Sequence, residues 1–239
     1  MSVSASDDRR AAQLELMATT RAIRRYRDEP IPEEDLATML FAASRAPSGS
    51  NRQGFRFLVI RRNEQGVAAR RILAGAAQAM WQHKREADGY DGGSGGDATS
   101  PKARMAATME QYVEHLGDAP IIVLACTVRH RPGPEETIGA SVYPACQNLL
   151  LAARALGHGG VMTTWHRACE DELRAELAIP DDAFLAATIT LGIPMGHHGP
   201  VRRRPLKELV WEGRWGTVPA WAVDPPGTRF TSAGPPRAT

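Results

Sequence analysis

The stretch RAPSGSNRQGFRFLVI, residues 45–60, decides how this chain folds, because it joins the end of one regular element to the start of another. Its second half is rich in β-forming residues and predicts a strand. Its first half is rich in residues that set turns or offer hydrogen bonds: Pro47, Ser48, Gly49, Asn51 and Gln53. A plain helix-to-strand connection accounts for some of these residues. A ligand-binding loop accounts for all of them.

The segments around this stretch predict an alternation of helices and strands. Apolar residues at helical spacing behind Pro32 and three acids predict a helix over residues 33–45. The runs at 55–62 and 119–128 predict two strands, both central in a sheet. Helices follow at 141–157, where Gly157 supplies a stop, and at 168–180, and residues 184–194 predict a last strand. Few strands among long helices predict an α+β fold, a sandwich of helices around a central mixed β-sheet.

Residues 74–117 interrupt this alternation as an insertion. Two helical segments flank the glycine-rich stretch DGYDGGSGGDATSP, residues 88–101, which we expect to be mobile. The helices carry Met80, Trp81, Met105 and Met109, which suit either an adaptable pocket wall or ordinary packing. We expect a helical extension over 1–18, one domain over 19–215 with 74–117 as a variable lid, and a Pro/Gly-rich tail over 216–239. That tail is either disordered or wrapped over another surface.

The composition excludes several classes of protein. In 239 residues the net charge is only +2, so no overall field favours nucleic acid or a membrane surface. The three cysteines have no metal-type spacing, which predicts free thiols, no metal site and a cytoplasmic location. His197 and His198 have no third ligand nearby and are expected to face solvent. The N-terminus lacks the apolar core of a signal peptide, and no apolar run approaches the roughly 20 residues of a membrane span.

Two arginine clusters and one glycine cluster are candidates for binding. Arg21 and Arg24 are three residues apart and would converge on one anion in helical or turn geometry. Arg203 belongs to a second run, before a helix expected to start at Pro205. Solvated surface charge is the alternative for both runs, and nucleic acid is disfavoured because no known nucleic-acid-binding motif is present and the acids nearly cancel the bases. In GHGGVMTTWHR, residues 157–167, three glycines allow close approach to a flat ligand, whose edge Thr163 and Thr164 could bond.

Residues 21–60 resemble the N-terminal signature of the FMN-dependent nitroreductase family, R-x-S-I-R-x-F followed by P-x-x-x-L-x-x-L-x-x-A-x-x-A-P-S-x-x-N-x-Q-P-W-x-F. QNLLLAARALG (147–157), TLGIP (190–194) and RRRPLKELV (202–210) are similar, in the same order, to the family's central helix, last internal strand and C-terminal phosphate-side segment. The resemblance covers roughly residues 19–215. Two departures stand out: Ala22 replaces the usual Ser, and Gly54 with Phe55 replaces Pro-Trp.

The resemblance implies an intertwined homodimer with two FMN sites at the subunit interface. Arg21, Ala22 and Arg24 would hold the FMN phosphate and ribityl chain, and Arg203 would close that region. Pro47, Ser48, Gly49 and Asn51 would reach the partner's flavin, with Gln53 just beyond them. Backbone groups of Thr163 and Thr164 would lie against the ring near N5.

The same resemblance implies a reaction. NADPH or NADH would reduce the flavin, and a planar acceptor such as a nitroaromatic or a quinone would reoxidise it in a ping-pong cycle, with no catalytic side chain required. An alternative is an FMN-dependent oxidase or dehydrogenase of a small metabolite or peptide-derived product. A non-enzymatic helical interaction or nucleic-acid-binding protein is the alternative of another class, and it predicts a colourless preparation.

Overall fold

The computed structural model describes residues 5–128, 135–196, 201 and 203–226. The chain divides into two compact units, Met1–Thr19 with His197–Thr239 and Thr20–Gly196. Residues 1–4 of the expected extension, Arg202, the pair His197 and His198, and residues 227–239 of the expected tail lie outside the described residues. No helix in the described part of the chain is long and apolar enough to cross a membrane.

The first unit contains helix α1 (Ala5–Thr19) and a C-terminal segment with one short turn, η6 (Leu206–Glu208). A helix starting at Pro205 was expected, and this prediction was wrong, because the chain makes only a single 3₁₀ turn there. The Asp224 carboxylate accepts from the N–H of Leu206 at 3.0 Å. Gly213 and Gly216 then adopt φ of 71° and 89°, which turn the chain away from a helical path.

The second unit is built on a four-stranded sheet. Its strands are β1 (Phe55–Arg61), β2 (Ile121–Val128), β3 (Gly159–Thr163) and β4 (Ala183–Gly192), in the order β1-β2-β4-β3. All neighbouring strands pair antiparallel, and the parallel part is an isolated bridge between Ala22 and Gly160. The expected α+β fold is confirmed. The expectation that residues 55–62 form a central strand was wrong, because β1 lies at the edge of the described sheet, where its arginines can reach solvent.

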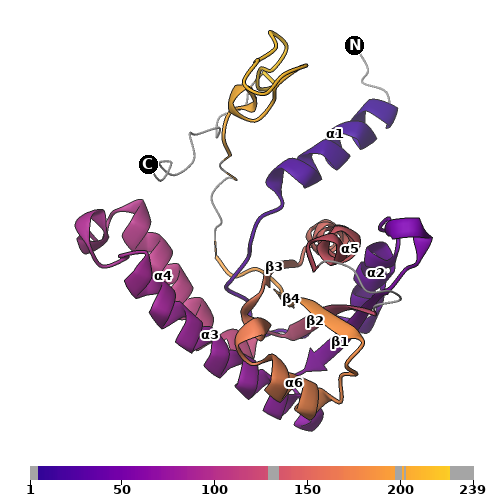
Figure 1. Cartoon of the computed structure of the whole chain (residues 1–239), viewed down its shortest axis with the longest axis vertical. Coiled ribbons are helices and arrows are strands. Elements are labelled where there is room, and N and C mark those ends of the chain that lie inside the picture. The colour runs from indigo at the N-terminus through magenta and orange to yellow at the C-terminus, as the bar shows by residue number, and fades with distance from the viewer. Residues whose placement is uncertain (1–4, 129–134, 197–200, 202, 227–239) are drawn as a thin grey trace. The chain divides into compact units, whose positions relative to one another are not determined.

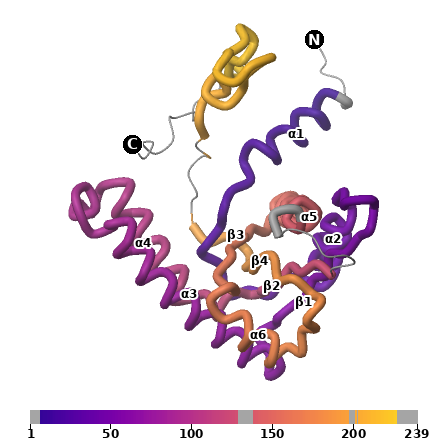
Figure 2. Tube along the Cα trace, viewed as in Figure 1, coloured from indigo at the N-terminus to yellow at the C-terminus, as the bar shows by residue number. Residues whose placement is uncertain are grey.

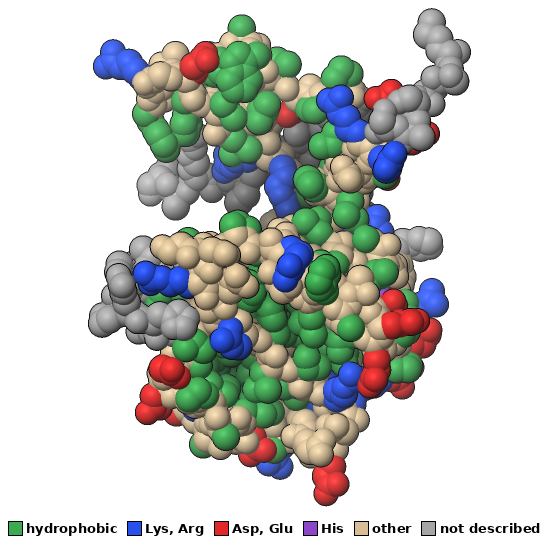
Figure 3. Space-filling model, turned by 90° about the vertical axis from the view of Figure 1, so that its right-hand side faces the viewer, with side chains coloured by type: hydrophobic (Ala, Val, Ile, Leu, Met, Phe, Trp, Pro, Cys, Tyr) green, Lys and Arg blue, Asp and Glu red, His purple; other side chains and the backbone are tan. Residues whose placement is uncertain are grey.

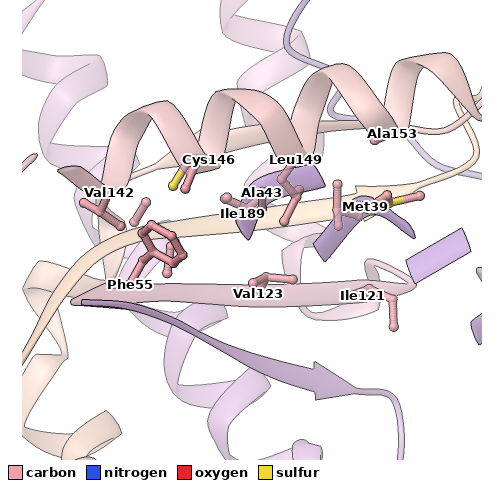
Figure 4. Packing of buried hydrophobic residues seen from close by; sticks show 14 of the residues in the cluster. Met39, Ala43, Phe55, Ile121, Val123, Val142, Cys146, Leu149, Ala153 and Ile189 are labelled. Atoms are coloured by element: carbon pink, nitrogen blue, oxygen red, sulfur yellow. The ribbon is translucent and has the colours of Figure 1, made fainter. Parts of the chain in front are cut away.

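Helices cover both faces of this sheet (Figure 1, Figure 2). Helices α2 (Glu33–Ser44) and α5 (Glu135–Ala155) lie on one face, and α3 (Val67–Ala87), α4 (Pro101–Glu114) and α6 (Glu170–Leu177) on the other. Figure 4 shows Val142, Cys146 and Leu149 of α5 directed at the sheet. Alternate residues of β2 enter the two cores, Val123 on the α5 side and Leu124 on the α3 side. The predicted helices of the second unit and the buried strands β2 and β4 are thus present, although α5 starts earlier than expected and contains Pro144.

The insertion is a helical hairpin of α3 and α4 whose glycine-rich tip is tied down by polar contacts. Arg85 pairs with Asp91 at 2.8 Å and with Glu110 at 2.9 Å, and Glu110 also accepts from the indole N–H of Trp81 at 2.6 Å. Trp81 is buried between the helices and so cannot serve as a free pocket wall, whereas Met105 is 45% exposed.

Arg70 fastens the base of the hairpin to the sheet. Its buried guanidinium donates to the carbonyl oxygens of Ile60 and Arg61 at the end of β1, and to those of Gly117 and Ala119 before β2, at 2.7–2.9 Å. Burial lowers the pKa of Arg70 to about 10. A charged group that is buried this deeply persists because its donors are satisfied, so the hairpin is joined firmly to the sheet.

Candidate functional site

The first arginine cluster lies on residues 20–28, which cross one end of the sheet and are called here the arginine segment. Ala22 bridges to Gly160 on β3, Tyr26 bridges to Pro194, and the N–H of Ile23 donates to the Gly160 carbonyl at 2.9 Å. Within this segment only Ala22 and Tyr26 make strand-type bridges, and the Tyr26 hydroxyl donates back to the Ile23 carbonyl at 2.6 Å, so residues 23–25 are neither a helix nor a regular strand. The helical geometry considered for Arg21 and Arg24 is therefore absent, and the binding of one anion by both stays a prediction.

The glycines at the start of β3 are required by packing. A Cβ on Gly160 would lie 2.5 Å from the Thr190 carbonyl oxygen, and one on Gly159 would lie 2.6 Å from Cγ1 of Ile23. The GxGG run therefore lets the arginine segment and β4 approach β3 closely. Gly157 lies two residues after the last residue of α5 and has a φ of 83°, so it stops the helix as the sequence predicted.

Arg24 lies beside a buried cluster of hydroxyl groups. The hydroxyls of Tyr26 and Tyr112 contact the Thr190 hydroxyl at 2.8 and 2.9 Å. Burial raises the pKa of Tyr112 to about 12 and that of Tyr26 well above its ordinary value, while the charge of Arg24 opposes both shifts. The Nε of Arg24 is buried and has no hydrogen-bond partner in the described part of the chain. A ligand oxygen would satisfy this donor.

Residues 47–53 form an exposed and strained loop before β1. Ser50, Asn51 and Gln53 have φ of 53°, 51° and 50°, in the left-handed region that side chains disfavour. Several hydrogen bonds hold the loop. Among them, the Ser48 hydroxyl accepts from the N–H of Gln53 at 2.9 Å, and the Ser141 hydroxyl on α5 accepts from the N–H of Gly49 at 3.1 Å. Strain of this kind, about 1–3 kcal/mol per residue, is concentrated at ligand-binding segments.

The strand register places this loop and the arginine segment at opposite corners of the sheet. Phe55, just after the loop, pairs with Thr127 near the far end of β2. Gly160, beside the arginine segment, pairs with Leu191, which itself pairs with Ile121 at the near end of β2. The two ends of β2 are about 20 Å apart at ~3.3 Å per residue, and β1 and β3 lie at the two edges of the described sheet.

The end of β3 carries the two threonines. The Thr163 hydroxyl donates to the Thr188 carbonyl at 3.3 Å, and Thr164 is exposed. Next to them, the ring of Trp165 packs on that of Tyr112 with centroids 5.5 Å apart. Ten of the eleven expected site residues lie in the second unit, where the Ala22–Gly160 bridge joins the arginine segment to β3, and Arg203 lies in the first unit.

The hydroxyl cluster and His166 were not expected from the sequence. His166 is fully buried and contacts the Thr188 hydroxyl and the Leu185 carbonyl, each at 3.1 Å. No local pattern signals such contacts, since Tyr26 and Thr190 are 164 positions apart. Among the described residues, no group of three or more His, Cys, Asp or Glu side chains could hold a metal ion. The three cysteines are unpaired and buried.

The family model of the nitroreductase family matches residues 17–195. This chain belongs to the nitroreductase family. The resemblance seen in the sequence is thereby confirmed.

The proteins that are similar to this nitroreductase-family chain have different enzyme names. It is 29% identical over 206 residues to a NADH dehydrogenase of Thermus thermophilus, covering 80% of this chain and 90% of that protein. It is 28% identical over 203 residues to a 5,6-dimethylbenzimidazole synthase of Rhodospirillum rubrum, covering 81% and 86%. The crystal structure of a nitroreductase-type protein of Desulfovibrio desulfuricans in complex with FMN is similar in fold, with a TM-score of 0.61, 29% identity, and coverage of 85% of this chain and 97% of that one.

Proposed function

We propose that this protein is an FMN-dependent oxidoreductase that takes a hydride from NADPH or NADH and passes electrons to a planar acceptor such as a nitroaromatic or a quinone. The similar protein of Desulfovibrio desulfuricans is in complex with FMN, and a relative is named for NADH oxidation. The observation that carries the proposal is the Nε of Arg24, a buried donor that finds no acceptor among the described residues.

The residues present fit a flavin nucleotide. Arg21, Ala22 and Arg24 would bind its polar atoms from the segment at residues 20–28. We assign Arg21 to the phosphate end of the nucleotide and Arg24, whose buried Nε lacks an acceptor in the described part of the chain, toward the ring. A fixed cation near the ring would stabilise negative charge on it.

The edge of β3 that faces away from β4 suits the rim of a flat ring beyond its bridge to Ala22. Gly160 directs its carbonyl away from β4, toward Ile23. By the two-residue repeat of a strand, Met162 presents its backbone groups on the same side, and Thr164 follows at the strand end. Backbone donors at this edge would orient the ring without a catalytic side chain.

When bound, FMN supplies the hydride and electron transfer. The chain's part is to hold the ring against β3, to keep Arg24 desolvated beside it, and to leave one face open for a donor and then an acceptor. Stacking on that face favours planar acceptors. Pro47, Ser48, Gly49, Asn51 and Gln53 lie too far from the arginine segment of their own chain to share its ligand. We therefore assign this loop to the flavin of a second copy of the chain in a homodimer.

An absorption spectrum and an anaerobic titration test this proposal. The purified protein should be yellow with about one FMN per chain, NADPH or NADH should bleach it under argon, and a quinone should restore the colour. Because hydrogen bonds to charged groups are worth roughly 1.5–3 kcal/mol, Arg24→Ala should weaken FMN binding about tenfold or more. Arg71→Ala, on the exposed face of α3, is the matched control and should change nothing.

The synthase among the similar proteins favours a second candidate, an FMN-dependent oxidase or dehydrogenase of a small metabolite. Yellow protein that neither nicotinamide donor bleaches would support this second candidate. Protein that stays colourless after incubation with FMN would refute both.

A further inference from the structure

A basic pocket of about 430 Å³ lies alongside the arginine segment, within the second unit. Its volume falls in the range of small-molecule sites, roughly 300–1,000 Å³. The charged residues that line it include four arginines and two aspartates: Arg24, Arg25, Arg27, Arg62, Asp28 and Asp118. We call it the arginine pocket.

The carboxylates near this pocket are already engaged. Asp28 pairs with Arg62 at 2.5 Å, Asp118 contacts His115 at 3.1 Å, and Glu29 pairs with Arg27 at 3.6 Å. Arg24 and Arg25 have no carboxylate within 4.0 Å in the described ranges of the chain. Both charges on the pocket wall therefore lack a counter-ion among the described residues. Under the proposed function the flavin takes Arg24, which leaves the charge of Arg25 for a second anionic ligand.

Arg25 is held in position by its backbone and keeps its side chain available. Its carbonyl accepts from the N–H of Met195 at 3.0 Å, which ties the segment to the chain after β4. Its guanidinium lies beside Gly196, because a Cβ built on that glycine would be 3.7 Å from Nη2 of Arg25. A planar guanidinium with free N–H groups is suited to bind phosphate in a bidentate manner.

We propose that the arginine pocket binds a phosphoryl group of the nicotinamide dinucleotide donor. The inference rests on the proposed function, because Arg24 lines both this pocket and the flavin site, so that a ligand in the pocket would lie next to the flavin. A nitroaromatic or quinone acceptor carries no phosphate. The donor would thus occupy the arginine pocket while it reduces the flavin, and the pocket would be empty while the acceptor reoxidises the flavin. In this way the protein could distinguish two substrates that stack on the same face of the ring.

The test uses flavin-loaded protein and rapid-mixing reduction under argon, with three donors: NADPH, NADH and 1-benzyl-1,4-dihydronicotinamide, which has no phosphate. In Arg25→Gln, the NADPH concentration that gives half the maximal rate of flavin reduction should rise about tenfold, because the substitution removes a charged hydrogen-bond donor to phosphate. The benzyl donor, the limiting rate and the FMN content should not change. Arg71→Gln, which removes the same charge from α3, is the control and should match the parent. Inorganic pyrophosphate should compete with NADPH in the parent at constant ionic strength, and less well in Arg25→Gln.

The three donors also identify the phosphate. An equal loss with NADPH and NADH supports the proposal and assigns the diphosphate, and a loss confined to NADPH supports it and assigns the 2′-phosphate. The proposal is overturned by unchanged NADPH dependence, by an equal loss with the benzyl donor, or by loss of FMN from Arg25→Gln, which would assign the pocket to the flavin's own phosphate. Yellow parent protein that none of the three donors reduces would instead reject the proposed function.

Discussion

His166 should give the second unit a characteristic pH dependence. Burial lowers the pKa of this side chain, which is therefore neutral in the folded protein, whereas it titrates near 6.5 in the unfolded chain. The unfolded state then binds more protons below about pH 6.5, so the free energy of unfolding should fall as the pH drops from 6.5 toward the lowered pKa. Urea unfolding of the FMN-free protein between pH 5 and 7.5 should show this loss.

His166→Gln provides the comparison for that series. The variant should be less stable at every pH, because it alters two buried contacts, but its stability should change less between pH 7.5 and 5.5 than that of the parent. Asp91 and Asp97 do not interfere, since hydrogen bonds keep their pKa values below the ordinary range and they titrate at lower pH. An unchanged slope in the variant would assign the pH dependence to another group.

Gly160 is a second position where one residue controls local geometry. Gly160→Ala places a Cβ 2.5 Å from the Thr190 carbonyl oxygen, and a backbone atom cannot move aside cheaply. We expect a loss of about 1–3 kcal/mol in the free energy of unfolding. Gly75→Ala on α3 meets no atom within 4 Å and should be neutral or stabilising by up to about 1 kcal/mol. Equal urea midpoints for the two variants would contradict this explanation.

At the scale of elements, the sequence predicted most helices and the two buried strands because their hydrophobic patterns are local. It missed β3, which has five residues and begins with two glycines. It also placed β1 at the centre of the sheet, since a short apolar run does not show how many neighbours a strand has. The conformation of residues 20–28 comes from partners on β3 and after β4, far away in sequence. Such partners leave no periodicity in the segment itself.

The hairpin of α3 and α4 is the element that we expect to select the acceptor. Its tip is ordered by Arg85, Asp91 and Glu110, and its base is fixed by Arg70, so its exposed side chains, Met105 among them, are held in defined positions. Replacing residues 89–100 by a short linker should change KM and kcat for bulky acceptors far more than FMN binding or NADPH-driven reduction. Constants within about twofold of the parent for acceptors of several sizes, a difference of only ~0.4 kcal/mol, would show that the tip does not take part.

At the scale of the whole molecule, the positions of the arginine segment and of the loop at residues 47–53 at opposite corners of the sheet are the reason to expect a second chain. The arginine segment and the loop at residues 47–53 both have features of a ligand site, but strand register separates them within one chain. Figure 3 also shows hydrophobic side chains gathered on one side of the second unit. Phe41 on α2 is 63% exposed and Tyr143 on α5 is 39% exposed. An obligate dimer would bury such a surface, over roughly 2,000 Å² or more.

Subunit mixing tests this arrangement directly. One variant carries Arg24→Ala, and the other replaces residues 47–53 by glycines. Homodimers of either variant should hold FMN weakly, because every site lacks one of its two contributors. If each flavin uses the arginines of one chain and the loop of the other, a mixed dimer has one intact site and one doubly altered site. Random exchange of subunits should then restore about a quarter of the tight FMN sites of the parent, since about half of the dimers are mixed.

The contrasting outcome is equally specific. If each flavin were bound by the arginines and loop of a single chain, every site in a mixed dimer would still be altered, and mixing would restore no tight binding. Light scattering of the parent should give the mass of two chains, and a stable flavin-loaded monomer would also contradict the shared site. The residue contacts alone do not separate these cases. The register of the four described strands gives the reason to expect a shared site, because it places the two halves far apart in one chain, and subunit mixing decides between the two cases.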